Sequence, residues 1–356
     1  MCYPILLKKV YMKEGLMLAT IKDVAREAGV SISIVSKAFN NYPDVSEKTK
    51  KRILEVAKQL NYSPNLVAKN LSSKKTNTIG LISSGFLDSG VKDSNNSFQL
   101  FKGVYTAVEQ NQYDLAIYMI DSQKQKSKSY AAFCKERNIG GAILVGVRTD
   151  DPFFLELIGS EFPCVLVDVK IAMDCEYIGS VSTDNVAATK EMARHLLERN
   201  HKDIVVVTGK EETWVNTERL AGVREAMKEF GLVLREGDII HADFTEEKAY
   251  ELTAGFLKNR KPTAFLCFSD LMALGVIKAV KEAGLSIPED VSVTGFDGLL
   301  ISEFTQPALT TIEQDFFEMG RQAALMLQRL INGNAEETSI QIEYRFVDRD
   351  SVGERE

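Results

Sequence analysis

Histidine and cysteine are the side chains best suited to acid–base, nucleophilic or metal chemistry, and their spacing along the chain shows whether such chemistry is available. Of the three histidines, His195 lies in an expected helix, and His201 and His241 lie in connecting segments. The sequence contains no H-E-x-x-H, G-x-S-x-G, P-loop or G-x-G-x-x-G motif. The five cysteines are odd in number and lack C-x-x-C spacing: Cys2, Cys134, Cys164, Cys175 and Cys267. They indicate reduced, mostly buried thiols, and the sequence predicts no enzyme, metal site or cofactor.

A second kind of chemistry, the binding of a polyanion, is suggested by the uneven charge. The whole chain carries −7, whereas residues 19–76 hold eleven basic and five acidic residues and carry +6. Residues 1–18 add +2, so the chain from residue 77 onward carries −15. A basic head on an acidic body implies a polyanionic partner for the head alone. On charge alone, a solvated charged face is the alternative interpretation.

The basic segment has the pattern of a helix-turn-helix unit. Thr20 and Asp23 fit a capping box, and Gly29 can supply the left-handed turn that ends a first helix. Ser31 is a suitable N-cap for a second helix. Inward-facing positions are expected at Ile21, Val24, Ala25 and Ala28, then at Ile34, Val35 and Ala38, and at Ile53, Val56, Ala57 and Leu60 of a third helix over residues 46–60. The second helix of such a unit lies in the DNA major groove, and here its exposed residues are Ile32, Ser33, Ser36 and Lys37.

A short helix is expected to follow the head. Ser63 and Pro64 are a start signal, and the helix can run only two turns, to about Leu71. Helices of that length are marginal in water, so this one is expected to become ordered only when something docks on it.

From residue 78 the sequence alternates between apolar runs and amphipathic runs, which indicates parallel sheets with helices on both faces. Strands are expected at 79–82, 115–119, 142–147, 164–167, 204–207, 264–267 and 291–294. Helices are expected at 98–111, 130–137, 185–198, 216–230, 247–258, 271–283 and 315–330. The length of this region exceeds one such sheet, so two α/β lobes are expected. No apolar run reaches about 18 residues, and a cytoplasmic, nucleoid-associated protein is expected.

The head resembles the DNA-binding region of the lactose-repressor/galactose-repressor family of bacterial regulators, through TIKDVAREAGVS, VSKAFN and VSEKTKKRILEVAKQLNYSPN. The resemblance implies that Ile32, Ser33 and Lys37 read bases; Ile32 can meet a thymine methyl group but cannot hydrogen-bond a base. It also implies that Leu71 wedges into the minor groove, for which core packing is the alternative. The DNA-binding set expected on this basis is Thr20, Ser31, Ile32, Ser33, Ser36, Lys37, Asn40, Leu71 and Lys74.

The body resembles the periplasmic-binding-protein type I fold that this family uses as a sensor, through NIGGAILVGV, TERLAGVREAM, SDLMALGVIKAVKEAGLSIPEDVSVTGFD and PALTTIEQDFFEMG. The resemblance implies three crossings between lobes, near Thr183, Thr311 and Glu343. The expected division is residues 1–18 as an extension, with Met17 a plausible start; 19–62 as the head; 63–76 as hinge; 77–183 plus 312–342 as lobe 1; and 184–311 plus 343–356 as lobe 2.

Effector-binding residues follow from the same resemblance: Asp168, Trp214, Arg219, Ser269, Asp297 and Phe316. The planar fork of Arg219 suits two sugar hydroxyls or a carboxylate, and Asp297 would accept hydroxyl protons. A surface ion pair is the alternative for these two residues, and partial core packing is the alternative for Trp214. The sequence departs from the family in a long polar loop over 83–97 and in Asn200, where the family usually has glycine.

The function expected is an effector-controlled transcription regulator, usually a repressor, that binds a near-palindromic operator as a homodimer and has no membrane partner. A sugar or sugar derivative is the expected effector, and a phosphoprotein co-repressor is the alternative. A solute-binding protein would need a signal peptide and no DNA head, and an α/β enzyme would need a catalytic constellation that the sequence lacks.

Overall fold

The structure is a computed structural model that describes residues 19–39, 42–62, 76–84, 94–120, 129–147, 151–170, 175–211, 213–334 and 337–356. The chain divides into two compact units, Met1–Thr76 and Asn77–Glu356. Each unit is described separately.

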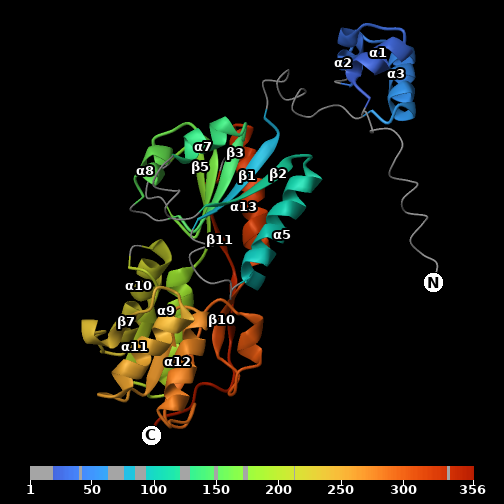
Figure 1. Cartoon of the computed structure of the whole chain (residues 1–356). Coiled ribbons are helices and arrows are strands. Elements are labelled where there is room, and N and C mark those ends of the chain that lie inside the picture. The colour runs from blue at the N-terminus through green and yellow to red at the C-terminus, as the bar shows by residue number, and fades with distance from the viewer. Residues whose placement is uncertain are drawn as a thin grey trace, which may run out of the picture. The chain divides into compact units, whose positions relative to one another are not determined.

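The first unit contains three helices, α1 (Ile21–Glu27), α2 (Ile32–Phe39) and α3 (Glu47–Gln59), around a small apolar core (Figure 1). The turn between α1 and α2 requires Gly29, whose φ of +63° is in the left-handed region. Ser46 caps α3 by accepting a hydrogen bond from the backbone N–H of Thr49. The fully buried side chains are Val24, Ala25, Ala28, Val35, Ala38, Ile53 and Ala57.

The expected inward position of Ile34 is wrong, because its side chain is 37% exposed. The buried side of α2 is formed by Val35 and Ala38, and Phe39 packs beside them. At about 100° per residue, Ile34 and Phe39 lie at equal angles on either side of Val35 and Ala38, so helical periodicity alone does not decide which of them packs inward.

The second unit begins with a six-stranded parallel sheet in the order β11-β5-β4-β3-β1-β2 (Figure 1). Alternate strand residues belong to different apolar clusters: Ile79 and Leu81 pack with the helices on one face, and Ile82 packs on the other. Helices α5 (Ser94–Gln110) and α13 (Phe316–Ile331) cover the first face, and α7 (Tyr130–Glu136) and α8 (Pro152–Ile158) cover the second. The strands are β1 (Thr78–Ser84), β2 (Asp114–Ile120), β3 (Gly141–Val145), β4 (Cys164–Val167), β5 (Ile178–Thr183) and β11 (Ser339–Ile342).

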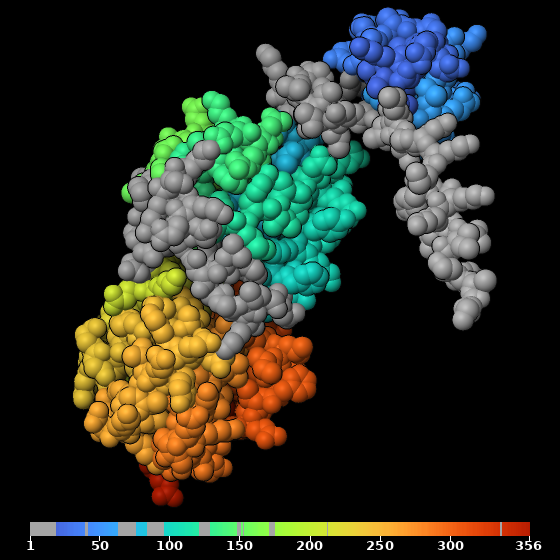
Figure 2. Space-filling view, viewed as in Figure 1, coloured from blue at the N-terminus to red at the C-terminus, as the bar shows by residue number. Residues whose placement is uncertain are grey.

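A second parallel sheet has four strands in the order β7-β6-β8-β9. These are β6 (Ile204–Thr208), β7 (Ile239–His241), β8 (Ala264–Cys267) and β9 (Ser292–Thr294). The helices of this lobe are α9 (Asn185–Glu198), α10 (Trp214–Glu229), α11 (Glu246–Leu257) and α12 (Asp270–Glu282), with short 3-10 helices η1 (Glu236–Asp238) and η2 (Leu300–Glu303). Figure 2 shows the two lobes as separate masses, coloured teal to green and gold to orange.

Three stretches of chain connect the two sheets. The first leaves β5 at Thr183 and enters α9, and the second runs from β9 through β10 (Thr311–Gln314) into α13. The third leaves β11 and enters β12 (Tyr344–Val347), which pairs antiparallel with β10 so that Gln314 is opposite Tyr344. The second and third connections are therefore joined by a two-stranded ladder.

The strands and helices expected within the described residues are all present, with ends shifted by a few residues, whereas the short helix expected after the head, to about Leu71, lies outside the described residues. The expected loop over 83–97 is wrong at both ends, because Ser83 and Ser84 belong to β1 and residues 94–97 to α5; residues 85–93 lie outside the described part. Five strands and one helix were not predicted: β5, β7, β10, β11, β12 and α8. None of the described helices is long and apolar enough to cross a membrane.

Candidate effector-binding site and DNA-binding head

Arg219 lies on α10 with only 3% of its surface exposed. Its Nε donates to Asn185 Oδ1 at 2.8 Å, its Nη1 donates to the carbonyl of Phe268, and the guanidinium stacks on Phe296 at 3.6 Å from the ring centroid. Gly222, one turn further along α10, allows α10 to pack this closely against α9, because a Cβ at residue 222 would lie 2.2 Å from the carbonyl oxygen of Val186 on α9. The close approach of α9 and α10 thus holds the guanidinium against the start of α9.

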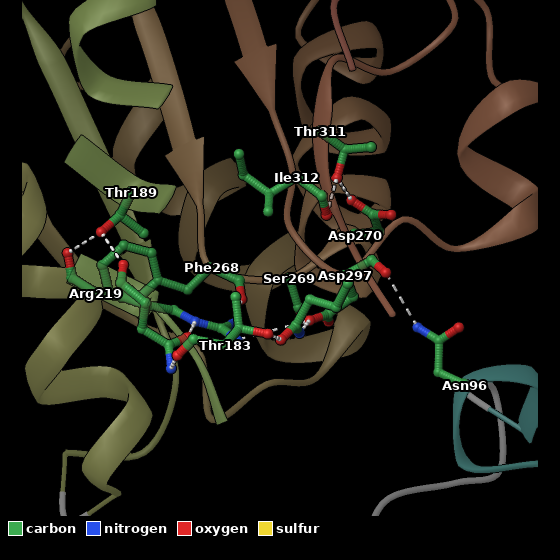
Figure 3. A network of polar contacts seen from close by, with 12 residues as sticks. Asn96, Thr183, Thr189, Arg219, Phe268, Ser269, Asp270, Asp297, Thr311 and Ile312 are labelled. Carbon is green, nitrogen blue, oxygen red and sulfur yellow. Dashed lines mark hydrogen bonds and ion pairs between the residues drawn. The ribbon is translucent and has the colours of Figure 1, made fainter. Parts of the chain in front are cut away.

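Asp297 follows β9 and lies beside the guanidinium, with its Oδ1 3.8 Å from Arg219 Nη2 (Figure 3). The same Oδ1 accepts a hydrogen bond from Gln314 Nε2 at 2.8 Å. Gln314 Oε1 in turn accepts from the Thr183 hydroxyl at 2.6 Å, and Asn96 Nδ2 donates to the Asp297 carbonyl at 3.4 Å. The Asp297 carboxylate is therefore linked through Gln314 to the ends of β10 and β5, and the Asp297 backbone carbonyl is bonded to α5 of the other lobe.

Asp168 follows β4 and takes a left-handed backbone conformation with φ of +60°. Its Oδ1 is removed from solvent and has no hydrogen-bond partner in the described part of the chain. Burial raises the pKa of Asp168 to about 6, although the positive charge of Arg219 acts in the opposite direction. A buried acceptor without a partner is costly, and a bound molecule that donates a hydrogen bond would remove that cost.

The three other expected effector residues have different surroundings. Ser269 is buried and caps α12, where its hydroxyl accepts from the N–H of Met272 at 3.2 Å. Trp214 begins α10 and packs against the apolar cluster beneath α7 and α8, and its buried Nε1 has no hydrogen-bond partner among the described residues. Phe316 begins α13 and packs on the apolar cluster between α13 and α5.

In the head, several of the polar residues expected to contact DNA form hydrogen bonds or an ion pair with other residues of the head. The Thr20 hydroxyl donates to Asp23 at 2.7 Å, Ser31 accepts from the N–H of Ile34 at 3.3 Å, and Lys37 pairs with Asp44. Ile32 and Ser33 are exposed and Ser36 is partly buried on α2. Asn40, Leu71 and Lys74 lie outside the described residues.

Histidines and thiols make structural contacts. His195 faces Asp348, and His241 lies between Thr208 and Glu211. Burial raises the pKa of Cys134 to about 12, so this thiol stays protonated at neutral pH. In the described part of the chain, no group of three or more His, Cys, Asp or Glu side chains could hold a metal ion.

Three residues of the site were missed from the sequence: Asn185, Phe296 and Gln314. Asn185 begins α9, two residues after the end of β5, and Gln314 ends β10; because neither strand was predicted, their strand-end positions gave no signal, although Gln314 lies in the segment PALTTIEQDFFEMG that carried the resemblance. Phe296 had no signal in the sequence, because an aromatic residue at the end of an apolar run is ordinarily core.

A helix-turn-helix head followed by a two-lobed α/β unit with a buried polar site defines a DNA-binding transcription regulator with a sensor domain. Comparison with known families agrees: residues 20–65 match the bacterial regulatory proteins of the lacI family, and residues 193–352 match the periplasmic binding protein-like domain. The chain belongs to the lacI family of bacterial regulatory proteins.

The relatives cover nearly the whole chain. Catabolite control protein A of Priestia megaterium is 32% identical over 94% of this chain and 100% of its own length. The transcriptional repressor PurR of Proteus mirabilis is 31% identical over 95% of this chain and 98% of its own. Among solved structures, the lac repressor dimer bound to operator and the anti-inducer ONPF is similar with a TM-score of 0.80 and 25% identity, over 94% of this chain and 99% of that one.

Proposed function

We propose that this regulator binds a near-palindromic operator as a homodimer and that an uncharged polyhydroxylated molecule, a sugar or sugar derivative, sets its operator affinity. The main support for a hydroxyl-bearing effector is the buried Oδ1 of Asp168, which is a hydrogen-bond acceptor without a partner in the described chain. A hydroxyl group of the effector would donate to it.

The charges around Arg219 favour a neutral ligand over an anion. The guanidinium already has Asn185, the Phe268 carbonyl and Asp297 as partners. Asp168 is a second carboxylate close enough to Arg219 for the arginine charge to lower its pKa. An anionic ligand would therefore face two carboxylates and a single guanidinium that already has partners. Effector contacts are therefore assigned to Asp168, Arg219 and Asp297, with Trp214, Ser269 and Phe316 in supporting positions.

The link between the site and DNA runs through the connecting strands. Gln314 bonds both Asp297 and Thr183, so a ligand that moves Asp297 also acts on the ends of β10 and β5. We assign lobe 1 to residues 77–183 plus 312–342 and lobe 2 to 184–311 plus 343–356. A change between the lobes would alter the spacing of two hinge segments, 63–76, in a dimer, and with it the minor-groove wedge Leu71.

A protein co-repressor is the second candidate, because catabolite control protein A is among the relatives. The buried, unsatisfied Asp168 favours the small molecule, since a docking protein would not fill it. Catalysis is not part of the proposal: the family relatives are transcription regulators.

The test uses two arginines on the same helix. Arg219→Gln removes the buried guanidinium, and Arg224→Gln removes an exposed one that pairs with Glu236 at 3.2 Å. D-ribose, D-glucose and cellobiose are screened by thermal shift, and the operator affinity of each variant is measured by fluorescence anisotropy with and without the sugar that raises the melting temperature. We expect the sugar response to be lost in Arg219→Gln and retained in Arg224→Gln. Equal responses in both variants would show that the site is assigned wrongly, and stabilisation by none of the three sugars would contradict the proposed effector class.

A further inference from the structure

The exposed face of α2 offers little hydrogen-bonding chemistry to a base. Ser31 is engaged as the cap of the helix, and Lys37 is paired with Asp44. Positions 32 and 33, at the N-terminal end that meets base edges in this motif, are Ile32 and Ser33. Arginine, asparagine and glutamine are absent from α2, and its one basic side chain is Lys37.

Ile32, at the N-terminal end of α2, has an aliphatic side chain that is 45% exposed, more than the 37% of Ile34 on the same helix. The head core is formed by other residues of α1, α2 and α3, and Ile32 is not among those that pack against it. Residues 19–76 carry a net charge of +6, and this positive charge favours a polyanion such as DNA as the partner that binds this face of α2.

We propose that Ile32 packs against the C5 methyl group of a pyrimidine in the major groove, so that the operator is read at this position through a methyl group. This proposal depends on the operator binding proposed above, and it identifies the chemical group of the operator that Ile32 recognises. In the major groove, thymine carries its methyl group at C5, and an aliphatic side chain recognises it by apolar contact.

A methyl contact has a consequence that hydrogen-bond readout lacks. 5-Methylcytosine carries the same C5 methyl group, whereas uracil and cytosine lack it. Ile32 therefore discriminates thymine from uracil and 5-methylcytosine from cytosine by the same factor, and cytosine methylation at this position strengthens operator binding. Burial of one methyl-sized group gives about a fourfold change in affinity per half-site, or about fifteenfold for a symmetrical operator.

The test starts with duplexes selected from a random library by the full-length protein. Each thymine of the enriched half-site is replaced in turn by uracil, 5-methylcytosine or cytosine, and dissociation constants are measured for the wild type, Ile32→Val and Ile32→Ser. At one position, we expect equal thymine/uracil and 5-methylcytosine/cytosine ratios of about fourfold in the wild type. Ile32→Val should retain part of both ratios, and Ile32→Ser should reduce both to about one.

Leu54→Ala is the matched control, because Leu54 is an aliphatic residue on α3 of the same head and is 43% exposed. It should leave both ratios unchanged. Failure to enrich any sequence would contradict the proposed operator binding itself. An enriched operator that tolerates uracil at every thymine, or ratios that persist in Ile32→Ser, would overturn the methyl contact alone.

Discussion

Asp168 and Arg219 are both withdrawn from water, but their partners differ. The guanidinium of Arg219 has two hydrogen-bond partners, an aromatic ring and a carboxylate around it. Asp168 has one oxygen with no partner in the described chain, and burial raises its pKa to about 6. A carboxyl group whose pKa is raised above its unfolded value binds protons more readily in the folded state, so its ionisation destabilises the fold as the pH rises from about 4 to 6.

Asp168→Asn is therefore expected to stabilise the protein at pH 7. The shift of the Asp168 pKa from 3.8 to about 6 corresponds to roughly 1–3 kcal/mol of folding free energy. Most of the gain should be lost by about pH 4, where the carboxyl is protonated in the folded state and about half protonated in the unfolded state. Urea unfolding between pH 4 and pH 8 measures the difference between variant and wild type.

Asp114→Asn serves as the control, because Asp114 is an exposed carboxylate at the start of β2. It should show no comparable pH-dependent gain. The same Asp168→Asn variant should also weaken the binding of a sugar effector at pH 7. A variant that is destabilised at pH 7, or that binds the effector as tightly as the wild type, would contradict the role given to Asp168.

At the scale of elements, the site depends on how closely helices pack. Gly222 on α10 lies against α9, where an added Cβ would be 2.2 Å from the Val186 carbonyl oxygen, whereas Gly255 on α11 has open space around it. Both glycines are in helix interiors, so an alanine gains the same helix propensity at either position.

Gly222→Ala and Gly255→Ala should therefore have opposite effects. We expect Gly255→Ala to stabilise by about 0.5–1 kcal/mol through propensity. Gly222→Ala should destabilise by about 2 kcal/mol or more, because α9 and α10 must separate, and should displace Arg219 from Asn185. Thermal unfolding and effector titration measure both effects. Equal stabilisation by the two substitutions would mean that α9 and α10 do not approach as closely as described.

The elements found from the sequence are those with a strong local pattern. Apolar runs such as those at β3 and β8, and the capping box of α1, predicted their elements directly. The missed strands β10 and β12 are four residues long and partly polar, and they form only because they pair with each other. The site was found in part: Arg219 and Asp297 came from the resemblance, whereas the bond from Thr183 to Gln314 joins residues 131 positions apart and has no local signature.

At the scale of the whole molecule, opposite charges are separated along the chain. Residues 19–76 carry +6, while the chain from residue 77 onward carries −15. The acidic body repels DNA, so the attraction for a duplex is concentrated in the head. The effector site, in contrast, holds a buried arginine and carboxylates that are shielded from bulk ions.

Salt should therefore separate the two binding activities. Two basic heads on one operator release counterions on binding, so we expect operator affinity to fall at least about 100-fold between about 50 and 200 mM salt, with a linear log–log dependence. The affinity for a neutral sugar should change by less than about twofold over the same range, since no net charge is neutralised. Anisotropy with labelled operator and calorimetry with the sugar, on one protein preparation, give the two slopes. A flat operator slope would contradict DNA binding by the head, whereas a steep sugar slope would indicate that the effector is charged and that Arg219 binds an anion.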